Sequence, residues 1–103
     1  PWEIAKGFDG SAKISNKFIN KNKLVLDDID FSLNLNNEIV QKGNSSKMIF
    51  SFDKIISYVS KFFTLKIGDI IFTGTPAGVG RIKKNDFLEG FLNRKKILEV
   101  KIK

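Results

Sequence analysis

The chain has 103 residues, a net charge of +7 and a hydrophobic fraction of 42%, which together predict one folded domain with a modest core. It contains no Cys and no His, and this composition excludes disulfides, zinc sites of the usual N/S type, Ser-His-Asp triads and Cys-His pairs within the chain. No apolar run approaches the roughly 20 residues that span a bilayer, and the first residues lack a signal-peptide pattern, so we expect a soluble cytoplasmic protein without membrane contact.

The first 25 residues show no sustained period and predict a loop-rich approach with short extended pieces. A clear β-pattern follows, because apolar and polar residues alternate strictly from Ile29 to Leu35, as in a half-buried strand. Asn36 and Asn37 both tolerate positive φ and suit a tight turn. We therefore predict a β-hairpin whose second strand covers about Glu38 to Gln41.

One helix is predicted over residues 52–63, where apolar residues recur at helical spacing behind Ser51, a suitable N-cap. The β-branched and aromatic run at residues 70–73 predicts a short buried strand. Leu98, Val100 and Ile102 alternate with charged residues and predict a final edge strand. This order of elements indicates a β-rich α+β architecture with one main helix.

The excess of Lys and Arg raises the possibility of nucleic-acid binding, since clustered cations release counterions from a phosphate backbone. Here the basic residues are scattered in groups such as 81–84 and 94–96, with no continuous basic helix and no interleaved aromatic signature. Compositional bias towards Lys, Ile, Phe and Asn explains the charge better. We therefore favour a small-molecule function over a basic nucleic-acid-binding protein.

The segment TGTPAGVG at residues 73–80 is rich in glycine and follows the predicted strand. Backbone amides in such a loop can approach an anionic ligand closely. The segment lacks the Gly-Lys-Ser/Thr ending of a Walker loop and the glycine spacing of a dinucleotide fingerprint. A purely structural turn, with Pro76 fixing φ, is the alternative interpretation.

Four segments together resemble the C-terminal half of fumarylacetoacetate hydrolase family proteins. They are PWEIAKGFDG at residues 1–10, GNSSKMIF at 43–50, the helix-containing stretch that follows, and IIFTGTPAGVG at 70–80. The resemblance implies that the whole chain, 1–103, is a single partial catalytic domain lacking its N-terminal half. It also implies part of the family's mixed β-roll, or barrel, architecture.

The resemblance implies a catalytic role for Lys6, whose ammonium matches the family's active-site lysine and would stabilise charge developing on a substrate oxygen. Thr75 matches the threonine that binds the substrate's carboxylate, and Gly74 belongs to the same pocket-lining TGTP segment. Gln41 matches a polar position near the pocket. Met48 to Phe50 are expected to be packing residues beside the pocket and at a dimer interface.

Mg²⁺ or Mn²⁺ is the cofactor implied for the complete enzyme. The family's carboxylate ligands and His-Glu pair belong to the half that this sequence does not contain, so we assign no metal ligand here. The backbone near Gly10 is a candidate for the metal's vicinity, whereas Asp9 is better interpreted as a turn residue.

Two functional hypotheses remain open. The first is the substrate-pocket half of a metal-dependent enzyme that acts on small 2-oxo or diketo acids by C–C hydrolysis, decarboxylation or isomerisation. Its expected partners are the missing half, in the same or another chain, and a second copy in a homodimer. The second is a catalytically inactive remnant or interaction fragment. Under both, we expect the isolated chain to be inactive and to expose apolar surface.

Overall fold

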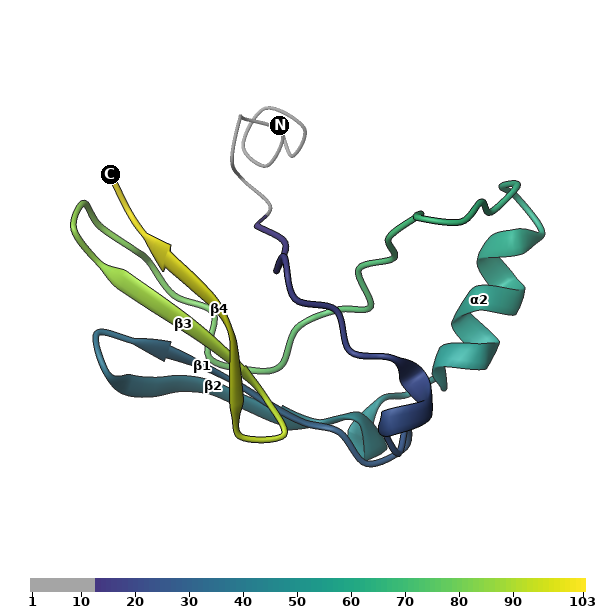
Figure 1. Cartoon of the computed structure of the whole chain (residues 1–103), viewed down its shortest axis with the longest axis horizontal. Helices are drawn as coiled ribbons and strands as arrows, with labels where there is room; N and C mark the ends of the chain where they lie inside the picture. The colour runs from purple at the N-terminus through teal and green to yellow at the C-terminus, as the bar shows by residue number, and fades with distance from the viewer. Residues whose placement is uncertain (1–12) are drawn as a thin grey trace.

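A computed structural model describes residues 13–103 of the chain. Four antiparallel strands form one sheet in the order β2-β1-β3-β4. The strands and helices are η1 (Lys21–Lys23), β1 (Asp30–Leu35), β2 (Glu38–Asn44), η2 (Ser45–Lys47), α2 (Phe52–Ser60), β3 (Phe87–Leu92) and β4 (Lys95–Lys101). The sheet occupies one side of the molecule and α2 stands on the other (Figure 1). This arrangement confirms the predicted β-rich α+β class.

The predicted hairpin is confirmed, with its turn at Asn36 and Asn37, whose φ values are 50° and 70°. The second strand runs to Asn44 and is three residues longer than predicted. A second hairpin joins β3 and β4 through Asn93 and Arg94, whose φ values are 47° and 67°. β4 lies at the edge of the sheet, as predicted for the last strand.

The two hairpins are joined through the asparagines of their own turns. Asn36 exchanges two hydrogen bonds with the backbone of Phe87: its N–H donates to the Phe87 carbonyl at 2.8 Å, and its Oδ1 accepts from the Phe87 N–H at 2.9 Å. At the opposite end of the sheet, Asn93 makes the same pair of bonds with Asp30, at 2.7 and 3.0 Å. These four bonds fix the register of β3 against β1.

α2 begins as predicted, because the Ser51 hydroxyl accepts a hydrogen bond from the Lys54 N–H at 3.2 Å. The helix ends at Ser60 rather than at residue 63. The N–H groups of Phe62 and Phe63 both donate to the Val59 carbonyl, so the chain turns out of the helix there. Among residues 13–103, no helix has the length and apolar character needed to cross a bilayer.

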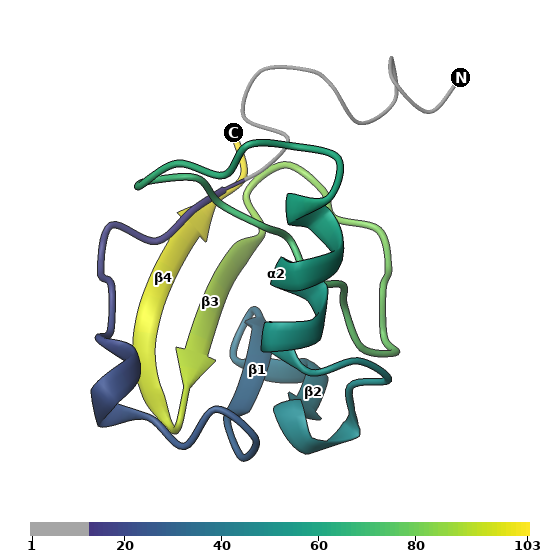
Figure 2. The same ribbon diagram turned by 90° about the vertical axis from the view of Figure 1, so that its right-hand side faces the viewer.

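The predicted strand at residues 70–73 is wrong. These residues form no strand, and Ile70 and Phe72 are 49% and 70% exposed. A β-branched and aromatic run favours an extended backbone, but a strand also needs a neighbouring strand for its hydrogen bonds. No strand of the described chain pairs with this run, which crosses between α2 and the sheet side of the molecule as an irregular segment (Figures 1 and 2).

The core of the described chain is small. Ile29 is its one buried apolar side chain, at 6% exposure. Ile29 is held beside Ser45, since the Ile29 N–H donates to the Ser45 hydroxyl at 2.8 Å and the Ser45 N–H donates to the Ile29 carbonyl at 2.9 Å. From the strand register, one face of the sheet carries seven apolar side chains, all half-buried: Phe31, Leu33, Leu35, Leu88, Leu92, Leu98 and Val100.

Asp86 is a buried carboxylate, 6% exposed, at the start of β3. Its side chain accepts hydrogen bonds from the Asn36 amide at 3.0 Å and from the Lys83 N–H at 2.7 Å. These two bonds, with the nearby Lys83 charge, hold the pKa of Asp86 below its ordinary value. Because the folded pKa is lowered, the stabilisation is present above the unfolded value of about 3.9 and is lost as the pH falls through the folded value.

We expect Asp86→Asn to lower the melting temperature at pH 7, because an amide cannot accept both bonds as well as a carboxylate can. The difference from the unsubstituted chain should be smaller at pH 3 than at pH 7, because the stabilisation by the folded carboxylate declines once the pH falls below the unfolded pKa of about 3.9. Thermal unfolding in dilute solution at both pH values checks this. Asp27→Asn is the matched control, because Asp27 is exposed; an equal effect of the two substitutions would contradict the role of Asp86.

Candidate functional site

Three of the four segments singled out in the sequence line one cavity of about 730 Å³, and the fourth, residues 1–10, lies outside the described residues. Thr73 to Pro76 line one part of it, and Lys47 to Phe50 line another. The remaining walls come from the end of β2, the first turn of α2 and the side chains of Phe31 and Leu92. Figure 2 shows α2 in front of the sheet, so the cavity lies between these elements.

Gln41 and Thr75 are brought into direct contact. The Gln41 side-chain nitrogen donates to the Thr75 hydroxyl oxygen at 2.8 Å and to the Pro76 carbonyl oxygen at 2.9 Å. Gln41 is half-buried in β2, whereas Thr75 is exposed at the cavity. Two residues predicted for the substrate pocket on separate segments are therefore neighbours, and Gln41 contacts the loop that carries Thr75.

Two glycines let the loop adopt its path. Gly74 has φ +114° and Gly78 has φ +106°, in the left-handed region that favours glycine. A Cβ built on Gly78 would lie 2.1 Å from the Val40 carbonyl oxygen, so the loop backbone touches the backbone of β2. The glycine richness of TGTPAGVG thus reflects a close approach to β2 as well as backbone conformation.

The charge lining the cavity is positive. Lys42 and Lys47 line it, and no Asp or Glu does so among the described residues. Lys42 pairs with Ser32, which puts its side chain on the other face of the sheet, where it also lines a second cavity. A small anion therefore meets the Lys47 cation and the Thr75 hydroxyl without a carboxylate to repel it. Sequence reasoning missed both lysines; their positions on either side of the Gly43-Asn44-Ser45 bend were the available signal.

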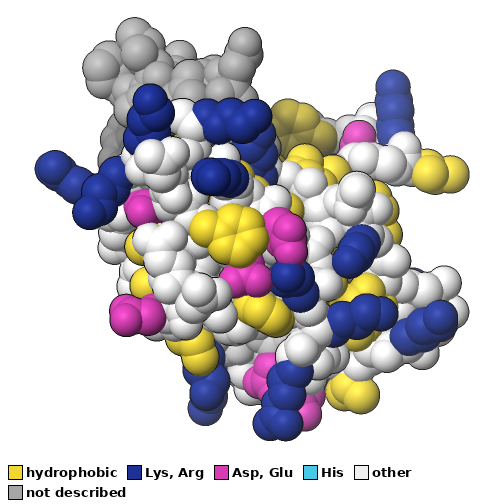
Figure 3. Space-filling model, turned by 60° about the vertical axis from the view of Figure 1, so that its left-hand side comes forward, with side chains coloured by type: hydrophobic (Ala, Val, Ile, Leu, Met, Phe, Trp, Pro, Cys, Tyr) yellow, Lys and Arg dark blue, Asp and Glu magenta, His cyan; other side chains and the backbone are white. Residues whose placement is uncertain are grey.

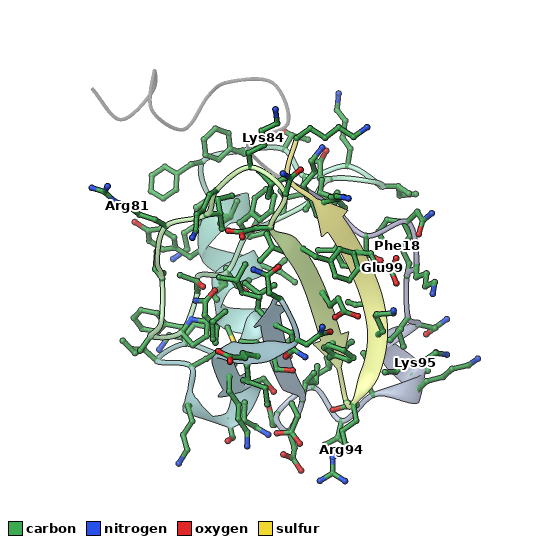
Figure 4. All side chains as sticks on the ribbon, turned by 90° about the vertical axis from the view of Figure 1, so that its left-hand side faces the viewer. Phe18, Arg81, Lys84, Arg94, Lys95 and Glu99 are labelled. Carbon is green, nitrogen blue, oxygen red and sulfur yellow. The ribbon has the colours of Figure 1, made fainter. Side chains whose placement is uncertain are left out.

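The basic residues as a whole do not gather into one patch on the face drawn in Figure 3, where Lys and Arg side chains are separated by other groups. Arg81, Lys84, Arg94 and Lys95 lie at different margins of the molecule (Figure 4). This distribution resembles solvated surface charge more than a continuous nucleic-acid footprint.

Three predicted positions, Lys6, Asp9 and Gly10, lie outside the described residues. Ile49 and Phe50 line the cavity and are 92% and 53% exposed. Within residues 13–103, the Lys54 ammonium lies 5.3 Å from the centre of the Phe50 ring. Packing of Met48 to Phe50 at a dimer interface stays a prediction.

Metal ligation was tested on the carboxylates of the described chain. Residues 13–103 hold no group of three or more Asp or Glu side chains placed to bind an ion together. Asp28 and Asp30 are near each other, but both accept hydrogen bonds from the Asn44 amide, at 2.9 and 2.8 Å. The donor set seen here does not fit a divalent metal by itself.

A second cavity, of about 400 Å³, includes Ser32, Asn34 and Arg94 in its walls and contains none of the predicted site residues. The candidate site is therefore the larger cavity, because Gly74 and Thr75 line it and Gln41 binds Thr75.

Comparison with known proteins gives a consistent assignment. The model of the fumarylacetoacetate hydrolase C-terminal domain matches residues 1–103. A mitochondrial oxaloacetate tautomerase of Bos taurus is 44% identical over 104 residues, covering 100% of this chain and 46% of that protein. The chain therefore spans about half the length of the curated relatives it matches.

Solved structures show the same relationship. A fumarylacetoacetate hydrolase family protein of Yersinia pestis is 46% identical with a TM-score of 0.89, covering 100% of this chain and 48% of its own. Fumarylpyruvate hydrolase from Pseudomonas aeruginosa, in complex with Mn²⁺ and pyruvate, is 30% identical with a TM-score of 0.72, covering 80% and 36%. The chain belongs to the fumarylacetoacetate hydrolase family, whose C-terminal domain it matches from its first residue to its last.

Proposed function

We propose that the chain forms the substrate-pocket half of a metal-dependent enzyme that acts on small 2-oxo or diketo acids. The observation that carries the proposal is the cavity that Thr75 and Lys47 both line without an opposing carboxylate among the described residues. A carboxylate ligand is complementary to this set, since cations and hydroxyl donors stabilise its charge.

The relatives support the substrate class. One is named an oxaloacetate tautomerase, and another is a fumarylpyruvate hydrolase whose structure holds Mn²⁺ and pyruvate. C–C hydrolysis, decarboxylation and isomerisation are all reactions in which a bound 2-oxo acid develops negative charge on its carbonyl oxygen. A divalent metal would supply Lewis acidity for that charge.

In this proposal, the described residues bind and orient the substrate. Thr75 donates a hydrogen bond to the carboxylate, and Lys47 attracts the anion into the cavity. By resemblance, Lys6 stabilises the developing oxyanion. The metal ligands come from outside residues 13–103, in keeping with relatives about twice the length of this chain.

An interaction fragment without catalysis is the second candidate, and the half-exposed apolar face of the sheet favours it. A turnover assay with oxaloacetate and acylpyruvates in the presence of Mg²⁺ or Mn²⁺ separates the two. The assay is run on the chain alone and on the chain mixed with the N-terminal half of a relative. Turnover that is abolished by Lys6→Ala supports the enzyme hypothesis. Absence of turnover both for the chain alone and for the mixture supports the interaction fragment.

We expect Lys47→Glu to weaken pyruvate binding by about tenfold, because an attractive charge at the cavity becomes repulsive. The loss should diminish at high salt, since Lys47 is exposed. Pyruvate titration followed by NMR measures the affinity. Lys95→Glu is the control, because Lys95 lines neither cavity; an equal loss there would indicate a general charge effect and contradict the site.

A further inference from the structure

We propose that Gln41 is a positioning residue that fixes the Thr75 hydroxyl as a hydrogen-bond donor towards the cavity. This point of the site would then select a ligand oxygen that can only accept, such as a carboxylate, over a ligand group that donates, such as a primary amide. The ligand part of the inference rests on the proposed function. The positioning part stands on contacts within the chain.

The orientation of the Gln41 amide is determined by its neighbours. A carbonyl oxygen can only accept a hydrogen bond, and the Pro76 carbonyl lies 2.9 Å from the Gln41 side-chain nitrogen. Exchanging the nitrogen and oxygen of the amide would place two acceptors in contact. The nitrogen therefore faces Pro76, and its second hydrogen is directed at the Thr75 oxygen, 2.8 Å away.

The polarity of Thr75 follows from this contact. A hydroxyl has one hydrogen to donate and lone pairs that accept. Because the Gln41 amide occupies a lone pair, the Thr75 hydrogen must point away from Gln41. Within residues 13–103, Thr75 makes no second side-chain hydrogen bond, so this hydrogen is available to a ligand in the cavity that Thr75 lines.

The loop position is fixed by adjacent residues of β2. The backbone of Gly78 lies close to the carbonyl oxygen of Val40, and the Gln41 side chain donates hydrogen bonds to both Thr75 and Pro76. The bond from Gln41 to the Pro76 carbonyl is partly buried, which shields it in part from competition by water, whereas the bond to Thr75 is exposed. Positioning by two neighbouring residues limits both sliding and rotation of the loop, so the direction of the Thr75 hydroxyl is set before a ligand arrives.

The contact itself is tested by NMR on the 103-residue chain, without any ligand. Thr75→Val keeps the shape of the side chain but removes the hydroxyl, whereas Thr75→Ser keeps the hydroxyl. We expect Thr75→Val to shift the Gln41 side-chain amide resonances and to speed their hydrogen exchange, and Thr75→Ser to leave them close to those of the unsubstituted chain. If Thr75→Val changes neither the chemical shifts nor the hydrogen exchange of the Gln41 side-chain amide, the positioning role is wrong, whatever the function of the chain.

The polarity is tested with pyruvate and its neutral analogue pyruvamide. In Gln41→Glu, a carboxylate replaces the amide and draws the Thr75 hydrogen towards itself, so the hydroxyl presents an acceptor to the cavity. We expect the preference for pyruvate over pyruvamide to fall by about tenfold. The reason is that the Thr75 hydroxyl would no longer donate to the pyruvate carboxylate, and two acceptors would face each other instead.

The new carboxylate also repels pyruvate directly, and its oxygen replaces the donor that faced the Pro76 carbonyl. Both effects remain when Thr75 is replaced by Val, so the Thr75→Val background separates them from the polarity of the hydroxyl. If polarity is the cause, most of the change in preference disappears when Gln41→Glu is made in the Thr75→Val background. A change of equal size in both backgrounds would overturn the polarity argument. If pyruvate does not bind to the unsubstituted chain, the proposed function is contradicted and the ligand part of this inference falls with it. The Gln41–Thr75 contact is decided separately, by the NMR experiment without ligand.

Discussion

Gly78→Ala should detach the loop of residues 74–80 from β2 and abolish the cavity as a binding site. The new Cβ would lie 2.1 Å from the Val40 carbonyl oxygen, and Gly78 has φ +106°. The backbone conformation alone costs an alanine about 1–3 kcal/mol, and the contact with backbone cannot be relieved by a side-chain rotation. The loop can escape by moving away, so the expected damage is local rather than global unfolding.

Hydrogen–deuterium exchange of the backbone amides in residues 74–80 measures this detachment, and pyruvate titration measures its effect on binding. We expect faster exchange in the loop with little change in β1 and β3, together with at least a tenfold loss of affinity because Thr75 leaves Gln41.

Two other glycines serve as matched controls. Gly74→Ala introduces strain at φ +114° but meets no atom within 4 Å, and Gly80→Ala meets none either and has no left-handed φ. We expect the increase in loop amide exchange and the loss of pyruvate affinity to be largest for Gly78→Ala, smaller for Gly74→Ala and smallest for Gly80→Ala. A Gly78→Ala loop that exchanges no faster than the Gly80→Ala loop would show that the contact with Val40 does not hold the loop.

The isolated chain should associate with itself in solution, because it leaves much apolar surface exposed. Ile29 is the one buried apolar side chain among the described residues, and Phe62, Phe63 and Phe72 are 66%, 69% and 70% exposed. Exposed apolar side chains, together with the edge strand β4, promote association. Light scattering after size-exclusion chromatography should show a mass that rises with concentration.

The surface responsible is tested by replacing two of these aromatics. Phe62→Lys with Phe63→Lys should shift the chain towards monomer. Asn16→Lys with Asn20→Lys adds the same charge at exposed polar positions and should shift it much less. A compact monomer of the unsubstituted chain at every concentration would contradict the prediction; equal dissociation by both pairs would assign the effect to charge alone.

The elements predicted correctly are those whose signals are local. Two consecutive asparagines at positive φ specify the first hairpin turn, and Ser51 caps α2 through a bond to a residue three positions away. β3 was not predicted, because FLEGFL does not alternate and contains Gly90. It becomes a strand through its register with β1 and β4, which the bonds of Asn36 and Asn93 fix.

The candidate site divides in the same way. Thr75, Gly74 and Gln41 were identified through resemblance to family segments, and Lys42 and Lys47 became visible only as walls of the cavity. The roles of the first three remain predictions. What the structure adds is the contact between Gln41 and Thr75, which are 34 positions apart.

By itself, the sequence determined the family, the α+β class, the first hairpin, the start of the helix and the edge position of the last strand. These depend on residue type, short-range periodicity and turn chemistry. Only the tertiary structure decided that residues 70–73 form no strand, that β3 does, and that Gln41 donates to Thr75. Strand pairing and side-chain hydrogen bonds between distant segments depend on which backbone groups fold next to each other, and no local pattern specifies that.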